Sequence, residues 1–306
     1  MTPEGFRRFL VVVACPAAAV LTTGCGPRDH RERATVVRES PRPDLVREFA
    51  GGTWVDLTHA FDDRTIYWPT ERGFRFELGK NGVTPKGYYY AANRLETAEH
   101  GGTHLDAPRH FAAEAQTAAD IPPARLVGEA AVVDVSGRCN ADPVYEVTVD
   151  DLRGWEERHG RQLVDMIVLL RTGWSARWGD QAAYLGTEAT GPEAVASLRF
   201  PGLAPDAARW LVEQRRIRAI GIDTASIDHG PSTLFQSHVL LCGAGVPIFE
   251  NVAEVERLPE QGAFVAALPM KIAGGSGGPL RIVARLPDTI SDRPPSGTAP
   301  TTSTAP

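Results

Sequence analysis

Short apolar runs rich in β-branched residues alternate along the chain with segments whose apolar residues recur at helical spacing. The runs predict strands within residues 130–137, 165–173, 217–228, 246–252, 262–272 and 279–286. The last two runs are joined by AGGSGG, which predicts a hairpin or a wide glycine loop. This alternation is typical of an α/β domain with a mixed sheet.

Helical patterns fall between these runs. We expect helices over residues 148–158, where Thr148 can cap the first turn, and over residues 206–215. A third helix is expected from near Ser232 to Cys242, ended by the glycines that follow it. Together the pattern predicts a single α/β domain with mixed β-sheet and flanking helices.

The N-terminal residues carry the pattern of an export signal. Arg7 and Arg8 precede the apolar run FLVVVACPAAAVL, which is too short to span a bilayer as a helix. The following small residues stand directly before Cys25, as in a bacterial lipoprotein processing site. We therefore expect an exported lipoprotein of the cell envelope with Cys25 as its lipidated residue. An ordinary cleaved signal with an incidental Cys25 is the alternative.

Composition divides the rest of the chain. Residues 1–24 are expected to be the signal, 25–50 a polar tether, 51–288 the folded domain and 289–306 a disordered Pro/Thr/Ser tail. With 42% hydrophobic residues, a net charge of -6 and no long basic stretch, a nucleic acid is not an expected partner. Cys139 and Cys242, the cysteines of the domain, are expected to be buried thiols, although export also permits a disulfide.

One segment concentrates the candidate chemistry: HGGTHLDAPRHF, from His100 to Phe111. The spacing of His100 and His104 suits a helical zinc motif, but the intervening Gly-Gly-Thr disfavours a helix. On an extended strand, His100, Gly102, His104 and Asp106 share a face. Gly102 would then leave room for a metal or substrate, and the proline at position 108 would end the strand before His110.

Two imidazoles and a carboxylate on one face form half of a coordination shell for a divalent ion and leave positions open for water. The alternative is a half-buried polar strand whose histidines are simply hydrogen-bonded. Three candidate ligands at alternate positions of one strand favour the metal site.

The same segment resembles the signature of the putative cyclase family, which includes bacterial kynurenine formamidase and isatin hydrolase. The family pattern His-x-Gly-Thr-His-x-Asp-x-Pro-x-His-Phe is matched at every fixed position. The similarity extends over roughly Trp54 to Leu286, through VDLTHAF, YWP, LLRTGW and GIDTASID. The resemblance implies a swivelling β/β/α cyclase-like fold.

The resemblance also implies one or two divalent ions, zinc or manganese. His100, His104 and Asp106 would bind the first ion, Asp106 would bridge, and His238 with Glu250 would complete the second site. Without the resemblance, Glu250 in an apolar strand could equally pair with an arginine, and His238 could be a hydrogen-bonded core residue.

By the same resemblance, the activity is hydrolysis of a carbon–nitrogen bond in a small amide, formamide or lactam. A divalent ion lowers the pKa of bound water to about 7 and so supplies hydroxide as nucleophile. His110 would be the proton shuttle. Tyr67 and Trp68 are candidate substrate walls, Trp174 is a weaker one, and a homo-oligomer is expected.

Two other functions stay open. A cyclase or dehydratase-type lyase could use the same ion and base on the same fold. A non-catalytic surface lipoprotein that binds metal or a small ligand is the second alternative, and His110 argues against it because a binder needs no proton shuttle.

Overall fold

The computed structural model describes residues 52–287. The expected signal, the tether with Cys25 and the tail therefore lie outside the described residues. Among residues 52–287, no helix combines the length and hydropathy needed to cross a membrane.

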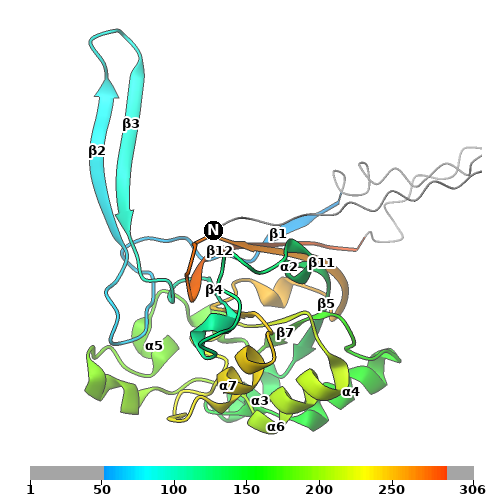
Figure 1. Cartoon of the computed structure of the whole chain (residues 1–306). Helices are drawn as coiled ribbons and strands as arrows, with labels where there is room; N and C mark the ends of the chain where they lie inside the picture. Colours follow the sequence, from blue (N-terminus) through cyan, green and yellow to red (C-terminus); the bar gives the residue numbers. More distant parts are fainter. Residues whose placement is uncertain (1–51, 288–306) are drawn as a thin grey trace, which may run out of the picture. The chain divides into compact units, whose positions relative to one another are not determined.

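An eight-stranded mixed sheet forms the centre of the domain, in the order β1-β12-β11-β5-β7-β9-β10-β4. The strands are β1 Trp54–Asp56, β4 His104–Asp106, β5 Val127–Asp134, β7 Ile167–Arg171, β9 Ala219–Ile222, β10 Ile248–Glu250, β11 Gln261–Pro269 and β12 Gly277–Arg285. Neighbours among β5, β7, β9 and β10 run parallel, and the remaining pairs are antiparallel. The start of β12 also pairs with β4, so the sheet closes into a barrel-like form (Figure 1).

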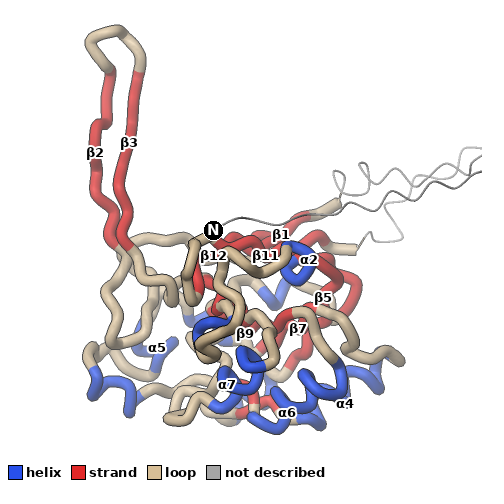
Figure 2. Tube along the Cα trace, viewed as in Figure 1, coloured by secondary structure: helices blue, strands red, loops and turns tan. Residues whose placement is uncertain are grey.

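Helices cover one face of the parallel strands (Figure 2). They are α3 Ser136–Ala141, α4 Val149–His159, α6 Pro205–Trp210 and α7 Gln236–Gly243. Val168 and Leu170 of β7 pack in the core on this face, while Ile167 and Leu169 pack in a second core on the opposite face. A strand that is buried on both faces has apolar residues at consecutive positions. The apolar runs in the sequence therefore predicted these strands.

Smaller elements complete the domain. They are α2 Pro123–Leu126, α5 Gln181–Leu185, the pair β6 Glu146–Val147 and β8 Gly202–Leu203, the short helices η1 Pro108–His110, η2 Trp174–Arg177, η3 Pro192–Ser197 and η5 Val255–Arg257, and the π-helix η4 Leu211–Arg215. Trp174, Tyr184 and Phe200 form a third apolar cluster beneath these loops.

The predicted elements exist, but several bounds were wrong. The run 217–228 is a strand only over β9, because the chain then bends to bring polar side chains to the sheet edge. Run 130–137 loses its end to α3. The helix expected from Ser232 begins only at Gln236, and the one over 206–215 changes to π geometry at Leu211. The hairpin β11–β12 and the Thr148 cap, a capping box with Asp151, agree with prediction.

One hairpin was not predicted at all. Strands β2 Arg75–Val83 and β3 Tyr89–Glu96 pair antiparallel and extend away from the sheet (Figure 1). Nearly every residue of both strands is exposed. Charged residues and glycines interrupt the apolar pattern, so no run marked these strands in the sequence.

Candidate functional site

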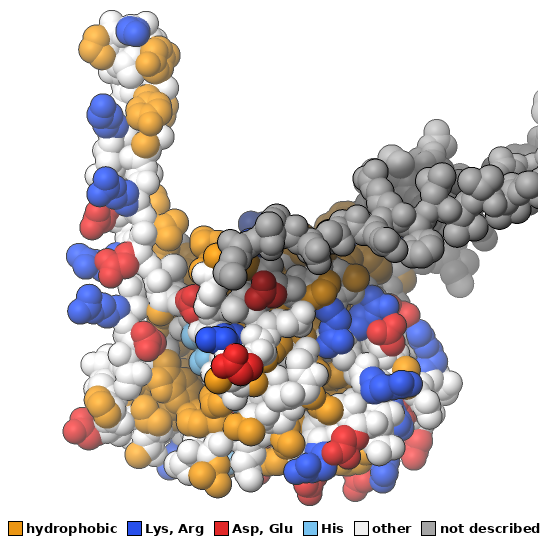
Figure 3. Space-filling view, viewed as in Figure 1, with side chains coloured by type: hydrophobic (Ala, Val, Ile, Leu, Met, Phe, Trp, Pro, Cys, Tyr) orange, Lys and Arg blue, Asp and Glu red, His pale blue; other side chains and the backbone are white. Residues whose placement is uncertain are grey.

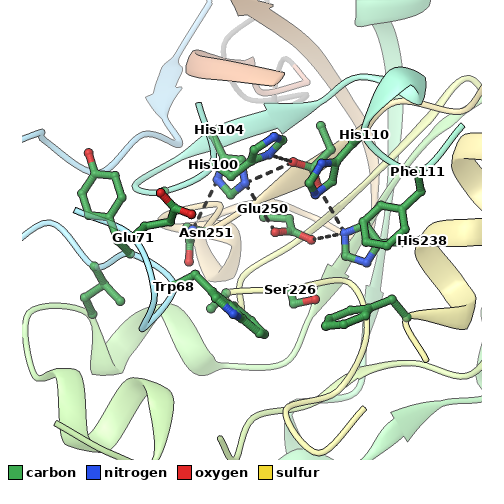
Figure 4. Close-up of a pocket in the computed structure, with 16 residues that line it drawn as sticks. Trp68, Glu71, His100, His104, His110, Phe111, Ser226, His238, Glu250 and Asn251 are labelled. Atoms are coloured by element: carbon green, nitrogen blue, oxygen red, sulfur yellow. Dashed lines mark hydrogen bonds and ion pairs between the residues drawn. The ribbon is translucent and has the colours of Figure 1, made fainter. Parts of the chain in front are cut away.

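A cavity of about 240 Å³ opens beside β4, β10 and α7 (Figure 4). Its lining combines aromatic side chains with the predicted site residues: Ile66, Tyr67, Trp68, Glu71, His100, Gly101, His104, Asp106, His110, Phe111, Ala225, Ser226, Phe235, His238, Glu250 and Asn251. Such a volume lies slightly below the usual range of ligand pockets, roughly 300 to 1,000 Å³.

Two strands place the central residues. On β4, Leu105 packs into the barrel core, so His104 and Asp106 on either side of it face the cavity. Glu250 of β10 lies directly opposite His104 in the antiparallel register, and its Oε2 is 3.5 Å from His104 Nε2. All three side chains are buried. Alternation along β4 is thus what the sequence argument anticipated for this half of the segment.

The first half of the segment is not a strand, which corrects the prediction. Gly101 has φ 156° and Gly102 has φ 59°, a left-handed conformation, so the chain bends before β4 begins. Gly102 does not clear space for a ligand: a Cβ there would lie 2.6 Å from the ring of Phe61. The bend nevertheless brings His100 Nδ1 to 2.6 Å from Asp106 Oδ1.

Helix α7 supplies His238 from a distant part of the sequence. Its Nε2 lies 3.1 Å from Glu250 Oε1 and 3.3 Å from Asp106 Oδ2. Asp228 fixes this orientation, because its carboxylate accepts from the backbone N–H groups of Ser237 and His238 and lies 2.7 Å from His238 Nδ1. A carboxylate behind a histidine is the usual support of a metal ligand.

The hydrogen-bond partners determine which nitrogens are free. His104 Nδ1 faces the Gly102 carbonyl at 3.0 Å, and His238 Nδ1 faces Asp228. Both partners only accept, so in neutral rings the hydrogen is on Nδ1 and the Nε2 lone pair points at carboxylate oxygens. Lone pairs facing carboxylates require a positive charge between them.

The pKa values of His104 and His238 also indicate that positive charge is favoured between these side chains. Burial disfavours a charged His104, but the carboxylates of Asp106 and Glu250 outweigh it and raise the pKa of His104 to about 9. Burial likewise opposes charge on His238, yet its carboxylate partners raise its pKa well above the ordinary value. No lysine or arginine is among the described residues that line the cavity. The donors are two imidazoles, each with its Nε2 atom within 3.5 Å of both carboxylates, and they fit a divalent cation. His238 nevertheless belongs to neither group of described donor atoms that all lie within 4.8 Å of one another.

His100 and His110 form the other side of the site. Ser276 Oγ donates to Glu99 at 2.6 Å and lies 2.8 Å from His100 Nε2, which orients the His100 ring. The ring of His110, on η1, stacks on that of His100 with centroids 3.8 Å apart. Burial is the main cause that lowers the pKa of His110 to about 4.

The donor atoms group differently from the sequence-based assignment. One cluster holds His100, Asp106 and His110, and the other holds His104, Asp106 and Glu250. In both, Asp106 is the shared member. His110 is thus a candidate metal ligand as well as a residue of the cavity lining.

Several residues that line the cavity or support its donors were not singled out from the sequence. Asp228 and Asn251 had been given no part, although polar residues just past the ends of parallel strands mark ligand sites in α/β sheets. Asn251 Nδ2 donates to the Gly102 carbonyl at 2.6 Å and so supports the bend. Phe111 and Phe235 were also missed.

Of the other candidate residues, some line the cavity and some do not. Tyr67 and Trp68 line it, and their contact with substrate stays a prediction. Trp174 does not: it is buried in the third cluster and its Nε1 donates to the Tyr184 carbonyl. Cys139 and Cys242 are free and buried, and burial raises the pKa of each thiol to about 12.

These features define a class: a mixed α/β domain with a barrel-like sheet and a His/Asp/Glu candidate metal centre at the sheet edge. The family model described as putative cyclase matches residues 55–229, and the chain belongs to this family.

Comparison with individual proteins agrees. Isatin hydrolase of Roseibium aggregatum is 32% identical over 209 residues, which cover 66% of this chain and 77% of that protein. Kynurenine formamidase of Bacillus cereus is 26% identical over 238 residues, covering 76% and 97%. The solved structure of isatin hydrolase A from Ralstonia solanacearum superposes with a TM-score of 0.71 at 31% identity, covering 81% of this chain and all of that one.

Proposed function

We propose that the chain is a metal-dependent hydrolase that cleaves the carbon–nitrogen bond of a small aromatic amide, with a cyclic amide of the isatin type as the best-fitting substrate. The observation that carries the proposal is the convergence of His104 and His238 lone pairs on the carboxylates of Asp106 and Glu250. The similarity to proteins named isatin hydrolase and kynurenine formamidase supports the same reaction class. It offers nothing for a lyase or a pure binder.

The metal ligands would come from His100, His104, Asp106, His238 and Glu250, for one or two ions of zinc or manganese. When bound, the ion supplies an activated water and polarises the amide carbonyl. The protein holds each donor in place beforehand, through Asp228 for His238 and the Gly102 carbonyl for His104. This preorganisation keeps the donors from turning toward other partners.

His110 would move the proton. Its ring borders the cavity and rests against His100. It takes a proton from the attacking water as the carbon–oxygen bond forms, and returns that proton to the nitrogen as the carbon–nitrogen bond breaks. The two steps leave His110 in its starting state.

The cavity wall favours a flat and uncharged substrate. Trp68 and Phe111 provide ring surfaces around the donor cluster (Figure 4). Phe235 also lines the cavity. Because the described lining contains Glu71 and no lysine or arginine, a substrate carboxylate would have no fixed cation to pair with. A neutral lactam meets these conditions better than an amino acid formamide.

Purified protein loaded with zinc or manganese tests the proposal against isatin and N-formylkynurenine. We expect turnover of the lactam, and a fall of about 10² to 10⁴ in His110→Ala with unchanged metal content. His104→Ala should lose metal. His229→Ala, a half-buried histidine beside Glu146 and outside the cavity, is the control.

Three outcomes would contradict parts of the proposal. Near-normal turnover by His110→Ala removes the shuttle role. Loss of metal from His110→Ala makes His110 a ligand instead. No turnover of any amide, formamide or lactam by the metal-loaded protein removes the hydrolase.

A further inference from the structure

Asn251, the residue after Glu250, contacts the segment that carries His104 at two points. Its side-chain Nδ2 donates to the Gly102 carbonyl at 2.6 Å, and its own backbone carbonyl accepts from Thr103 Oγ1 at 2.7 Å. Figure 4 shows Asn251 beside His104 at the cavity wall. Asn251 therefore joins the chain just after one candidate metal ligand to the chain just before another.

The backbone of Asn251 is in the left-handed region, with φ 53°. This conformation costs free energy for most residues that carry a side chain, and asparagine is among the few that adopt it readily. Such conformations persist where the surrounding structure fixes them, and they gather at functional sites. Glycine would also suit this backbone, so what asparagine adds at the position is its amide group.

A buried hydroxyl determines which way the amide of Asn251 faces. Tyr184, on α5, donates from its Oη to Asn251 Oδ1 at 2.8 Å and also lies 3.0 Å from the Asp223 carbonyl. The opposite amide orientation would set Asn251 Oδ1 against the Gly102 carbonyl, and two acceptors at that distance repel each other. Burial is the main cause that raises the pKa of Tyr184 well above its ordinary value, so the hydroxyl keeps the hydrogen that it donates.

The Gly102 carbonyl is the point where these contacts reach His104. It accepts from Asn251 Nδ2 and faces His104 Nδ1 at 3.0 Å, which uses both of its lone pairs. The two nitrogens are 3.5 Å apart. Because both donate to the same oxygen, they do not bond to each other, and the free lone pair of His104 is left on Nε2.

These contacts lie inside the protein. Asn251 is 2% exposed, and Tyr184 and Thr103 have no exposed surface. Figure 3 shows histidine atoms at the surface, beside hydrophobic side chains. Tyr184, by contrast, is not among the described residues that line the cavity. An effect of its hydroxyl on the site must therefore pass through the residues that it contacts.

We propose that Asn251 and Tyr184 act together as positioning residues for His104. Tyr184 orients the Asn251 amide, and that amide holds the Gly102 carbonyl, which directs His104 Nε2 toward the candidate metal position. Both ends of the amide are occupied within the protein, so it is not available to bind a substrate. This inference rests on the proposed function, because the direction of His104 Nε2 matters only if a metal binds there.

Zinc affinity measured without substrate tests this role. Asn251→Gly keeps a residue suited to φ 53° and removes the amide, so we expect zinc affinity to fall about 10- to 100-fold. Tyr184→Phe removes only the hydroxyl and should lower the affinity about 2- to 10-fold. Because both residues act through one amide, adding Tyr184→Phe to Asn251→Gly should change the affinity less than about twofold further.

Tyr145→Phe is the matched control, because Tyr145 Oη donates to Asp151 at 2.7 Å outside the cavity. Its zinc affinity should equal that of the wild type. Long-range ¹H–¹⁵N correlation spectra of the zinc-loaded protein give a second readout: the Nδ1–H of His104 should exchange with solvent faster in Asn251→Gly than in the wild type. Far-UV circular dichroism confirms that each variant is folded.

Other results would overturn the inference. Wild-type zinc affinity in Asn251→Gly, together with loss of zinc from His104→Ala, excludes the positioning role and leaves the metal centre intact. Additive losses from Tyr184→Phe and Asn251→Gly would show two separate structural effects. A higher KM for isatin with unchanged zinc affinity would make Asn251 a substrate contact. Retention of zinc by His104→Ala would contradict the proposed function itself, and this inference with it.

Discussion

Asp228 shows how a residue outside the donor cluster can determine what the cluster does. Its carboxylate accepts from two backbone N–H groups at the start of α7 and holds His238 Nδ1. These bonds fix both the ring angle and the position of the free Nε2. Burial alone would raise the pKa of the Asp228 carboxyl. The contacts to His238 and to the backbone of α7 outweigh burial, so the pKa is lowered overall.

Asp228→Asn keeps the shape of the side chain and removes its charge. We expect metal affinity to fall about 10- to 100-fold, because the amide is a poorer acceptor for the His238 ring. Metal titration by isothermal calorimetry measures the effect. Asp150→Asn, exposed in the first turn of α4, is the control. Equal affinity of the two variants would show that Asp228 does not position a ligand.

At the scale of elements, α4 is joined to the π-helix η4 by a bidentate ion pair. Arg215 Nε lies 2.6 Å from Glu156 Oε1, and Arg215 Nη2 lies 2.7 Å from Oε2. The Leu163 N–H donates to the same carboxylate at 2.8 Å. Burial alone would raise the pKa of Glu156, but these partners outweigh burial and lower it.

A lowered pKa makes this contribution depend on pH. The stabilisation is present above the unfolded-state pKa, near 4.3, and is lost as the pH falls through the lower folded value. Glu156→Gln should therefore lower the free energy of unfolding by about 2 kcal/mol at pH 7, with a shrinking difference below about pH 4. Urea unfolding of Glu156→Gln between pH 7 and pH 4 measures this difference. The control is Glu157→Gln, because Glu157 is exposed and next to Glu156. A pH-independent difference would contradict the ionic origin.

Elements differ in how far sequence predicts them. Buried parallel strands and the Thr148 cap follow from local pattern, because a strand covered on both faces must be apolar throughout. The hairpin β2–β3 does not, because its strands are exposed and no buried face imposes an apolar pattern on them. The bend at Gly101 and Gly102 also escaped prediction, since packing of Phe61 and the Asn251 hydrogen bond select it.

In the whole molecule, barrel closure brings the site together. Strand β4 pairs with β10 on one side and with the start of β12 on the other. This places Glu250, Ser276 and the segment from His100 to Asp106 at one edge. The carboxylates of Asp106 and Glu250 are both buried here. Burial is the largest cause that raises the pKa of Glu250, and the negative charge of Asp106 is the next.

A divalent ion that relieves this repulsion should stabilise the fold. At 100-fold excess over its dissociation constant, a ligand adds about 2.7 kcal/mol, or roughly 5 to 10 °C in melting temperature for a domain of this size. Differential scanning fluorimetry after chelation should show that decrease, and added zinc or manganese should reverse it. An unchanged melting temperature after complete metal removal would contradict a metal in this cluster.

The sequence by itself determined the α/β class, the approximate places of the buried strands and helices, and the residue types of the site. These follow from local periodicity and from the dense run of histidine and carboxylate between His100 and His110. Only the tertiary structure decided which candidate donors lie together, that Asp228 holds His238, and that the hairpin β2–β3 extends away from the sheet. Those properties depend on how the chain folds back on itself, over 10 positions between Asp228 and His238 and over 132 between Asp106 and His238, and no local pattern encodes them.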